Sequence, residues 1–347
     1  MAADGASASR LRRITDYPAL LEEAWAQAHA PREPNAPTVI STFAGCGGSS
    51  LGYHMAGFRE LLAVEWEQNA ADTFRLNFPH VPLYHGDIAK LSVEECLRLA
   101  GVKPGELDVF DGSPPCQGFS TAGKREIGDA RNQLFREYCR LLQGLRPKAF
   151  VMENVSGMVK GDFKLVFAEI LRTLKGCGYR VKARLLNAMF FGVPQSRERM
   201  IFIGVRDDLA REPSHPAGWS EPVAIGNAAL NIPSSESRAM SPRASAIWHR
   251  LRPGQYGDEI RAGYDFGIFK PHPDRPLATI RKGETGGTGI MHWSECRWLA
   301  TRELARGGSF PDAFKFTSST EAVKRIGNSV PPLLMRSIAR HVRALIA

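Results

Sequence analysis

The stretch TVISTFAGCGGSSLG, residues 38–52, decides how this sequence folds. Its first five residues are small or β-branched, as is typical of a buried strand, and a glycine-rich turn then opens a helical pattern over residues 50–58. Such a turn lets a ligand approach the backbone, and the helix N-terminus can receive an anionic group. Ser50 stands where the dinucleotide fingerprint G-x-G-x-x-G has its third glycine, so the turn departs from that fingerprint.

Short apolar runs continue to alternate with helical patterns as far as residue 210. The segments that we interpret as strands are TVIST, LLAVEW, PLYHGDI, LDVFDG, AFVMENV and RMIFIGV. Amphipathic patterns of helical period separate most of these runs. The alternation predicts an α/β fold, with a mostly parallel sheet that helices cover on both faces.

Changes in composition divide the chain into four expected regions. Residues 1–37 form an N-terminal extension with one predicted helix, over residues 17–29, and a proline-rich linker. Residues 38–207 form the α/β domain. Residues 208–316 are rich in Pro, Gly, Ser and Arg and predict a second, smaller, loop-rich domain with a hinge. Residues 317–347 contain a basic amphipathic helix and are expected to return to the first domain.

Charge and cysteine content narrow the class of protein. The 347 residues carry a net charge of +9, which favours a polyanionic partner such as nucleic acid, although an acidic metabolite remains an alternative. The six cysteines are at least 20 positions apart, so we expect neither a CxxC-type metal site nor a secreted disulfide framework. With no run of 18 apolar residues and no signal peptide, the sequence predicts a cytoplasmic protein without a membrane segment.

Polar and aromatic residues at the strand ends suit an adenosine cofactor. Glu65 lies at the end of the second predicted strand, where a carboxylate can hold a ribose diol, and Asp87 ends the third, near an adenine amino group. Trp66 can stack on a purine, although it can equally be a core aromatic. Without a pyrophosphate fingerprint, S-adenosylmethionine is favoured over NAD.

One cysteine follows two prolines in SPPCQ, residues 113–117. Because proline fixes φ and donates no backbone hydrogen bond, Cys116 is expected in a positioned loop instead of a core, where most lone cysteines lie. A thiolate beside such a cofactor suits methylation of C5 of cytosine. Addition of the thiolate to C6 makes C5 an enamine carbon that can attack a methyl sulfonium.

Acidic and basic partners for this chemistry follow in MENV and QSRER. A carboxyl group at Glu153 can hydrogen-bond N3 and the N4 amine of the cytosine and stabilise the charge that develops there. Arg197 and Arg199 alternate at a strand start, so we expect them to share a face, orient that carboxylate, hold a phosphate and lower the thiol pKa. Exposed arginines without a role are the alternative.

Together these motifs resemble those of bacterial-type DNA (cytosine-5)-methyltransferases. FAGCGGSSLG, VEW, GDI, SPPCQGFS, MENV, QSRER, LATRELARGGSFPDAFKF and GNSVPP occur in the family order between residues 38 and 332. The resemblance implies a Rossmann-like S-adenosylmethionine-dependent fold, with Cys116 as nucleophile and Glu153 and Arg197 as its partners at a flipped cytosine. It also implies a cofactor site made of Phe43, Ala44, Gly45, Cys46, Gly47, Gly48, Glu65, Trp66, Asp87, Ile88, Pro115, Asn328 and Ser329.

For the partner, the resemblance implies double-stranded DNA. It makes residues 38–207 the catalytic domain and residues 208–316 the target recognition domain. Arginine and lysine suit guanine in the major groove, and the expected DNA contacts are Gln117, Ser120, Arg199, Arg275, Arg281 and Lys282. An ordinary surface hairpin is the alternative for residues 275–289. We expect a monomer without a metal ion, associated with the nucleoid when bound to DNA and functionally paired with a restriction endonuclease.

Two other functions stay open on the sequence alone. An RNA (tRNA) cytosine-5 methyltransferase would share the scaffold, but that subfamily carries a Cys-Phe-Thr element, and here Cys296 is followed by Arg297 and Trp298. A catalytically inactive DNA-binding protein would have no need to keep SPPCQ, MENV and QSRER together. Both observations favour the DNA methyltransferase.

Overall fold

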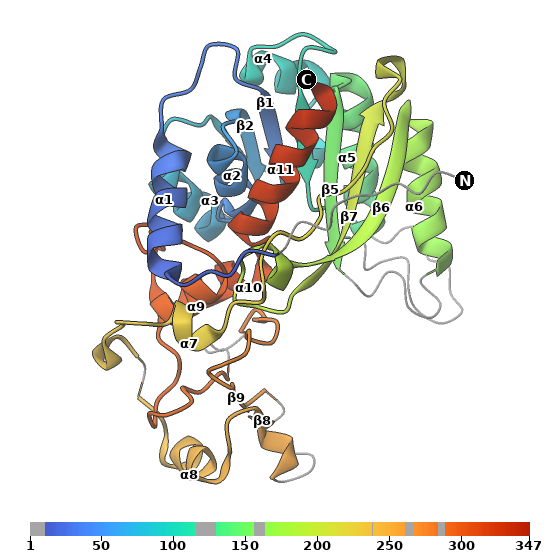
Figure 1. Cartoon of the computed structure of the whole chain (residues 1–347). Coiled ribbons are helices and arrows are strands. Elements are labelled where there is room, and N and C mark those ends of the chain that lie inside the picture. Colours follow the sequence, from blue (N-terminus) through green and yellow to red (C-terminus); the bar gives the residue numbers. More distant parts are fainter. Residues whose placement is uncertain (1–10, 116–129, 156–163, 238, 261–266, 284–288) are drawn as a thin grey trace, which may run out of the picture.

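The computed structural model describes residues 11–115, 130–155, 164–237, 239–260, 267–283 and 289–347. Within these residues seven strands form one sheet in the order β3-β2-β1-β4-β5-β7-β6 (Figure 1). The strands are β1 (Thr38–Thr42), β2 (Arg59–Glu65), β3 (Leu83–His85), β4 (Val109–Gly112), β5 (Ala149–Val155), β6 (Tyr179–Asn187) and β7 (Glu198–Arg206). All neighbouring pairs from β3 to β5 are parallel, and β7 runs antiparallel to both β5 and β6. The predicted mostly parallel sheet is therefore confirmed.

Strand β6 is absent from the strands that the sequence predicts. Its sequence, YRVKARLLN, places Arg180, Lys182 and Arg184 at every second position, so its apolar residues do not form a continuous run. It lies at an edge of the sheet and pairs only with β7 among the strands described. One polar face is compatible with an edge strand, and that pattern is weaker than the apolar run of a central strand.

Helices cover both faces of the sheet and enclose two apolar cores. On one face lie α1 (Tyr17–His29), α2 (Gly48–Met55), α3 (Gln68–Asn77) and α11 (Pro332–Ile346). On the other face lie α4 (Val93–Ala100), α5 (Ala130–Leu145) and α6 (Lys164–Gly176). The predicted N-terminal helix over residues 17–29 is present with the same bounds.

The glycine-rich turn fits its surroundings at two positions. Gly47 has φ +96°, in the left-handed region, and a Cβ there would collide with the ring of Phe78. At Gly52 a Cβ would lie 2.5 Å from Cβ of Met335 and 2.7 Å from the Pro332 carbonyl oxygen, so only glycine lets α11 pack this closely on α2. The turn and the C-terminal helix are thus fixed against each other.

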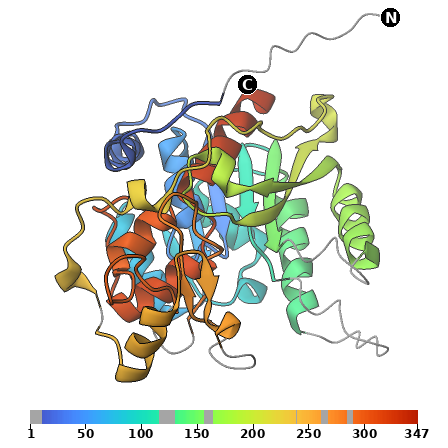
Figure 2. The same ribbon diagram turned by 60° about the horizontal axis from the view of Figure 1, so that its bottom comes forward.

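The loop-rich segment after β7 begins beside α11, where Arg211 donates to the Leu345 carbonyl at 3.0 Å. From residue 225 on, its helices and strands lie toward the opposite end of the molecule from the C-terminus (Figure 1). It contains α7 (Ile225–Ala228), α8 (Pro242–Arg250) and a two-stranded sheet of β8 (Gln255–Tyr256) and β9 (Phe269–Lys270). Turning the view brings forward this end, with α9 (Thr301–Gly307) and α10 (Ser319–Asn328) (Figure 2). The four-region division with boundaries at 37, 207 and 316 stays a prediction. In the described part of the chain, no helix is both long and apolar enough for a membrane span.

Candidate active site

A cavity of about 530 Å³ opens where the parallel strands end. Its wall comes from the residues directly after β1, β2, β3 and β4, together with the end of α10. Among the thirteen residues expected at a cofactor, those that line the cavity are Phe43, Ala44, Gly45, Cys46, Gly48, Glu65, Trp66, Asp87, Ile88, Pro115, Asn328 and Ser329. Gly47 is the exception, because it packs on Phe74 and Phe78 behind the turn.

Glu65 is held rigidly at the cavity wall by backbone donors. Its Oε2 accepts from the Gly45 N–H at 2.8 Å, and its Oε1 accepts from the N–H groups of Trp66 and Glu67 at 3.0 and 2.8 Å. A carboxylate has about four acceptor positions, so capacity remains for hydroxyl donors from a ligand. The end of β2 is thereby joined to the glycine-rich turn after β1.

Two further side chains at strand ends, Trp66 and Asp87, differ in whether the protein already uses them in a local contact. Trp66 is 76% exposed and lines the cavity, which excludes the core interpretation and leaves an indole face open to an aromatic ring. Asp87 uses Oδ1 to accept from the Ala89 N–H at 3.0 Å, so it caps the short helix Ile88–Lys90. Asp87 therefore has a local structural role as well as its place at the cavity.

The exposed indole gives a first prediction. Replacing Trp66 with alanine should raise the apparent Michaelis constant for S-adenosylmethionine by about tenfold, because stacking of the adenine base on the indole ring is lost. Steady-state methylation kinetics measure this constant. Leu76→Ala, also an exposed apolar residue but outside the cavity wall, is the control that should leave it unchanged. A changed target sequence in the Trp66 variant would place this residue in DNA recognition instead.

A cluster of charged residues that the sequence did not indicate, centred on Glu67 and Arg325, also borders the cavity. Arg325, buried in α10, donates to both oxygens of Glu67 at 2.6 Å, and Lys324 lies 2.5 Å from the same carboxylate. The hydrogen bond from Arg325 is the main cause that lowers the pKa of Glu67 to about 2. In the sequence these residues look like solvated helix faces; the only local signal is that Arg325 stands three residues before Asn328.

Cys46 is buried at the back of the cavity and is not a nucleophile. Its Sγ lies 3.3 Å from Oγ of Ser329, which joins the turn after β1 to the residue that follows α10. Burial raises the pKa of Cys46 to about 11, so the thiol stays protonated at neutral pH. Cys96, in α4, is likewise buried, and its pKa is raised to about 12.

The loop that carries the predicted nucleophile leaves the sheet at the cavity. Cys116, Gln117 and Ser120 lie outside the described residues. The residues before them are placed: Pro115 lines the cavity, and the Pro114 carbonyl accepts from Nδ2 of Asn154 at 3.0 Å. Asn154 directly follows Glu153 in MENV, so β5 fixes the start of the loop that holds Cys116.

The two arginines of QSRER have different direct partners, and only Arg199 forms an ion pair with Glu153. Arg199 pairs with that carboxylate, Nε to Oε1 at 2.6 Å. Arg197 is 1% exposed and instead donates to the carbonyls of Ile280 at 3.0 Å and Gly327 at 2.7 Å. Besides burial, which is the main cause, Arg199 lowers and Glu153 raises the pKa of Arg197, so the three charges still interact.

Gln195 and Arg197 hold the segment that carries two of the predicted DNA contacts. Gln195 accepts from the Ile280 N–H at 3.0 Å and donates to the Gly307 carbonyl at 3.1 Å. Ile280 is thus bound through both its N–H and its carbonyl, while Arg281 and Lys282 beside it are exposed. Burial is the main cause that lowers the pKa of Arg197 to about 9, so its guanidinium remains charged at neutral pH. Arg275 is exposed five residues before Ile280.

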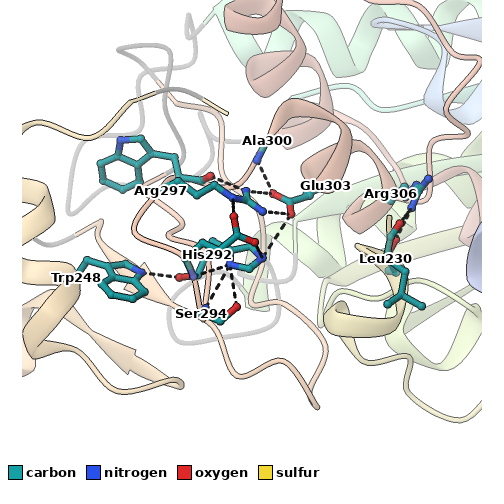
Figure 3. Close-up of polar contacts among 11 residues, drawn as sticks. Leu230, Trp248, His292, Ser294, Arg297, Ala300, Glu303 and Arg306 are labelled. Carbon is teal, nitrogen blue, oxygen red and sulfur yellow. Dashed lines mark hydrogen bonds and ion pairs between the residues drawn. The ribbon is translucent and has the colours of Figure 1, made fainter. Parts of the chain in front are cut away.

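A buried ion pair explains the LATRE motif (Figure 3). Arg297 donates to both oxygens of Glu303 at 2.8 and 2.9 Å, and Glu303, only 1% exposed, also accepts from the Ala300 N–H at 2.6 Å. His292 has Nε2 3.7 Å from Glu303 and accepts at its carbonyl from the Trp248 indole. These contacts fasten the loop-rich segment around α8 to the N-terminus of α9.

Asp111 adds a buried acid behind the cavity. Its Oδ1 accepts from the Tyr53 hydroxyl at 3.2 Å at the end of β4. Burial raises the pKa of Asp111 well above its usual range, and the neighbouring Glu60 and Glu153 raise it further. These surroundings favour the neutral form of the carboxyl group.

A second prediction uses that raised pKa. Because the folded protein binds a proton that the unfolded chain releases above about pH 4, the wild type should lose stability as pH rises from there through the raised pKa. Asp111→Asn keeps the acceptor for Tyr53 and has no such proton. Its stability relative to the wild type should therefore increase by about 1.4 kcal/mol for each pH unit between the unfolded and the folded pKa of Asp111. Urea unfolding at pH 5 and pH 8 measures it, and parallel pH dependences in the two proteins would contradict it.

Known proteins share both the sequence and the fold of this chain. The family model for C-5 cytosine-specific DNA methylase matches residues 37–239 and 247–344. Type II methyltransferase M1.HphI of Haemophilus parahaemolyticus is 36% identical over 332 residues, covering 88% of this chain and 86% of the relative. Type II methyltransferase M.NgoPII of Neisseria gonorrhoeae is 33% identical, covering 91% of this chain and 98% of the relative.

Solved structures agree on the fold. A protein described as a prophage-encoded DNA modification methyltransferase of E. coli superposes with a TM-score of 0.76, with 24% identity, over 89% of this chain and 99% of its own. A DNMT2 mutant from Spodoptera frugiperda has a TM-score of 0.67 with 18% identity, over 89% of this chain and 100% of its own. The family match spans nearly the whole chain, and the fold is that of methyltransferases. The chain therefore belongs to the C-5 cytosine-specific DNA methylase family.

Proposed function

We propose that this DNA (cytosine-5)-methyltransferase takes its methyl group from S-adenosylmethionine and reaches C5 of a flipped cytosine through a covalent bond between Cys116 and C6. The proposal rests on one observation above all. Glu153, paired with Arg199, lies beside Asn154, which holds the start of the Cys116 loop at the wall of the 530 Å³ cavity. A cofactor cavity, an acid and the anchored nucleophile loop thus meet at one edge of the sheet.

The cavity suits an adenosine group. Glu65 offers acceptor capacity for the ribose hydroxyls, Trp66 an open aromatic face for the adenine ring, and Asp87 a carboxylate near its amino group. Gly45 leaves room for close approach of the remaining atoms, because a Cβ there would meet no atom within 4 Å. Asn328 and Ser329 line the cavity beside the glycine-rich turn. When bound, S-adenosylmethionine supplies the methyl group that the activated C5 attacks.

The residues of this chain prepare the base for that attack. Addition of the Cys116 thiolate to C6 places negative charge on the ring, and Glu153 stabilises it by hydrogen bonding to N3 and the N4 amine. Arg199 orients the Glu153 carboxylate by direct contact, whereas Arg197 acts as a positioning residue that fixes Ile280 and Gly327. Loss of the C5 proton then allows β-elimination of the thiol.

Duplex DNA is the proposed substrate, read by residues 208–316 as the target recognition domain. Arg281 and Lys282 are exposed on an anchored segment, as base or phosphate contacts require, and Arg275 is exposed nearby. The curated relatives compared above are Type II methyltransferases, which supports a restriction–modification role with a partner endonuclease. We further propose a cytoplasmic monomer that joins the nucleoid when bound to DNA.

Tritium transfer from labelled S-adenosylmethionine tests the substrate class. Label should enter duplex DNA and not tRNA, and bisulfite sequencing of DNA from expressing cells should reveal 5-methylcytosine at one sequence. Label in tRNA alone would establish the RNA alternative. Sequence-specific DNA binding without any label transfer would establish the catalytically inactive alternative.

A further inference from the structure

A second cavity, of about 310 Å³, lies between α1, α11 and the residues that precede Ser220. It shares no lining residue with the 530 Å³ cavity. Both α1 and α11 pack on α2 (Figure 1). Because Arg12 and residues of α1 line the second cavity, the N-terminal extension forms part of its wall. Nothing in the methyl-transfer site uses it. The polar side chains that line it are Arg12, Glu23, Gln27, Arg336, Ser337 and Arg340.

Arg336 is a largely buried cation whose contact among the described residues is with the ring of Trp219. It is 7% exposed, lines the cavity, and its guanidinium carbon lies 5.7 Å from the ring centroid of Trp219. No ion pair or side-chain hydrogen bond joins it to another described residue. The other buried arginines, in contrast, all have carboxylate or carbonyl partners: Arg197, Arg297, Arg306 and Arg325.

Positive charge dominates the wall of this cavity. Arg12, Arg336 and Arg340 contribute three positive charges and Glu23 one negative charge, which leaves +2. Glu23 accepts from Gln27 at 2.9 Å, and Gln27 accepts from Arg340 at 3.2 Å. Glu23 also interacts with the charge of Arg336, but it offsets only one of the three positive charges. Burial, and next Arg340, lower the pKa of Arg336 to about 10, so it remains charged at neutral pH.

The surroundings fix these donors in place. Trp219 donates its indole N–H to Oγ of Ser337 at 3.0 Å, which holds the ring against the Arg336 guanidinium. The backbone of Arg12 is bound at both sides, from its N–H to the Trp219 carbonyl at 2.8 Å and from the Glu221 N–H to its carbonyl at 3.0 Å. A buried unpaired charge is costly unless a counter-charge is supplied. The cavity is therefore already organised for an anion.

We propose that the cavity between α1 and α11 binds a phosphate group through Arg336, with Arg12 and Arg340 completing the site. A guanidinium presents paired N–H donors that match two phosphate oxygens. The +2 of the wall attracts inorganic phosphate, which is partly dianionic at neutral pH, and also the monoanionic phosphodiester of DNA. The phosphate is either free inorganic phosphate or a backbone phosphate of DNA. This site gives the N-terminal extension a binding function that is independent of methyl transfer.

Thermal unfolding of the full chain in inorganic phosphate, against chloride at equal ionic strength, tests this site. Phosphate well above its dissociation constant should raise the wild-type Tm by about 2–4 °C. Arg336→Met, which keeps an unbranched side chain against Trp219, should lose this rise, and Arg340→Gln should weaken phosphate binding by about tenfold in calorimetric titration. Arg343→Gln, an exposed change on the same helix outside the cavity, should retain the full effect.

Two further measurements complete the test. In phosphate-free buffer, Arg336→Met should unfold at the same temperature as the wild type or higher, because it removes an unpaired buried charge. A duplex without cytosine should compete with phosphate if the source is DNA and should leave phosphate binding unchanged if the source is free phosphate. An equal Tm rise in the wild type and in both cavity variants would overturn the proposal. So would the absence of any Tm rise of the wild type with inorganic phosphate or with the duplex. A large loss of stability in Arg336→Met without phosphate would also overturn it.

Discussion

Cys116→Ala should lower methyl transfer to DNA by at least about a thousandfold, because it removes the nucleophile that activates C5. The change deletes little surface, so the dissociation constants for S-adenosylmethionine and for duplex DNA should stay within about twofold. Tritium transfer measures the first effect, and calorimetric titration and gel-shift assays measure the others. Cys177→Ala, a half-buried cysteine at the end of α6, is the matched control and should retain activity. Turnover of the Cys116 variant near the wild-type rate would contradict the covalent mechanism.

Glu153→Gln should lower the rate of methyl transfer by about 100- to 10,000-fold while DNA binding persists. The amide can still hydrogen-bond the cytosine ring, but it is a poor proton donor and breaks the 2.6 Å ion pair with Arg199. Single-turnover kinetics separate this loss from product release.

Glu198→Gln makes the same chemical change one residue before Arg199, on an exposed side chain at the start of β7. It should keep at least about half of the wild-type rate, as most exposed substitutions away from a site are mild. If both glutamine variants turned over alike, Glu153 would have no part in the mechanism.

Local sequence patterns were sufficient to predict the sheet because central parallel strands are buried on both faces. TVIST is buried at all five positions and pairs with β2 and β4, as expected for such a strand. YRVKARLLN was missed as a strand because alternating charges at an edge resemble a solvated segment. A polar edge strand such as β6 is recognised mainly by its pairing with a neighbouring strand. Its partner, β7, comes later in the chain, so the local sequence of β6 does not reveal this pairing.

The gathering of the predicted cofactor residues around one cavity has a related reason. The carboxyl ends of parallel strands converge at one edge of a sheet, so Glu65, Asp87 and Pro115 had to lie near one another once the strands were assigned. The pairing of Glu67 with Arg325 joins residues 258 positions apart and depends on how α10 packs. No local pattern encodes such a contact.

The arginines of QSRER show a limit of predictions from the period-two alternation of side chains along a strand. Period-two alternation predicts a shared face for Arg197 and Arg199 but not their partners. Arg199 pairs with Glu153, whereas Arg197 donates to carbonyls of Ile280 and Gly327, which are distant in the sequence. The N-terminal extension shows a similar limit. Its helix was predicted with the correct bounds, but the cavity that it forms with Arg336 requires the packing of α11.

Trapping of the enzyme on 5-fluorocytosine tests the central claim most directly. After Cys116 has added to C6 and C5 has been methylated, release requires loss of the C5 substituent as a cation, and fluorine cannot leave in that way. The thiol therefore cannot be expelled by β-elimination. Duplex DNA with 5-fluorocytosine at the target, incubated with S-adenosylmethionine, should give a denaturation-resistant adduct. Mass spectrometry should map it to Cys116 in the peptide spanning residues 111–125. An adduct on Cys46 or Cys139, or none from an enzyme active on ordinary cytosine, would contradict the mechanism.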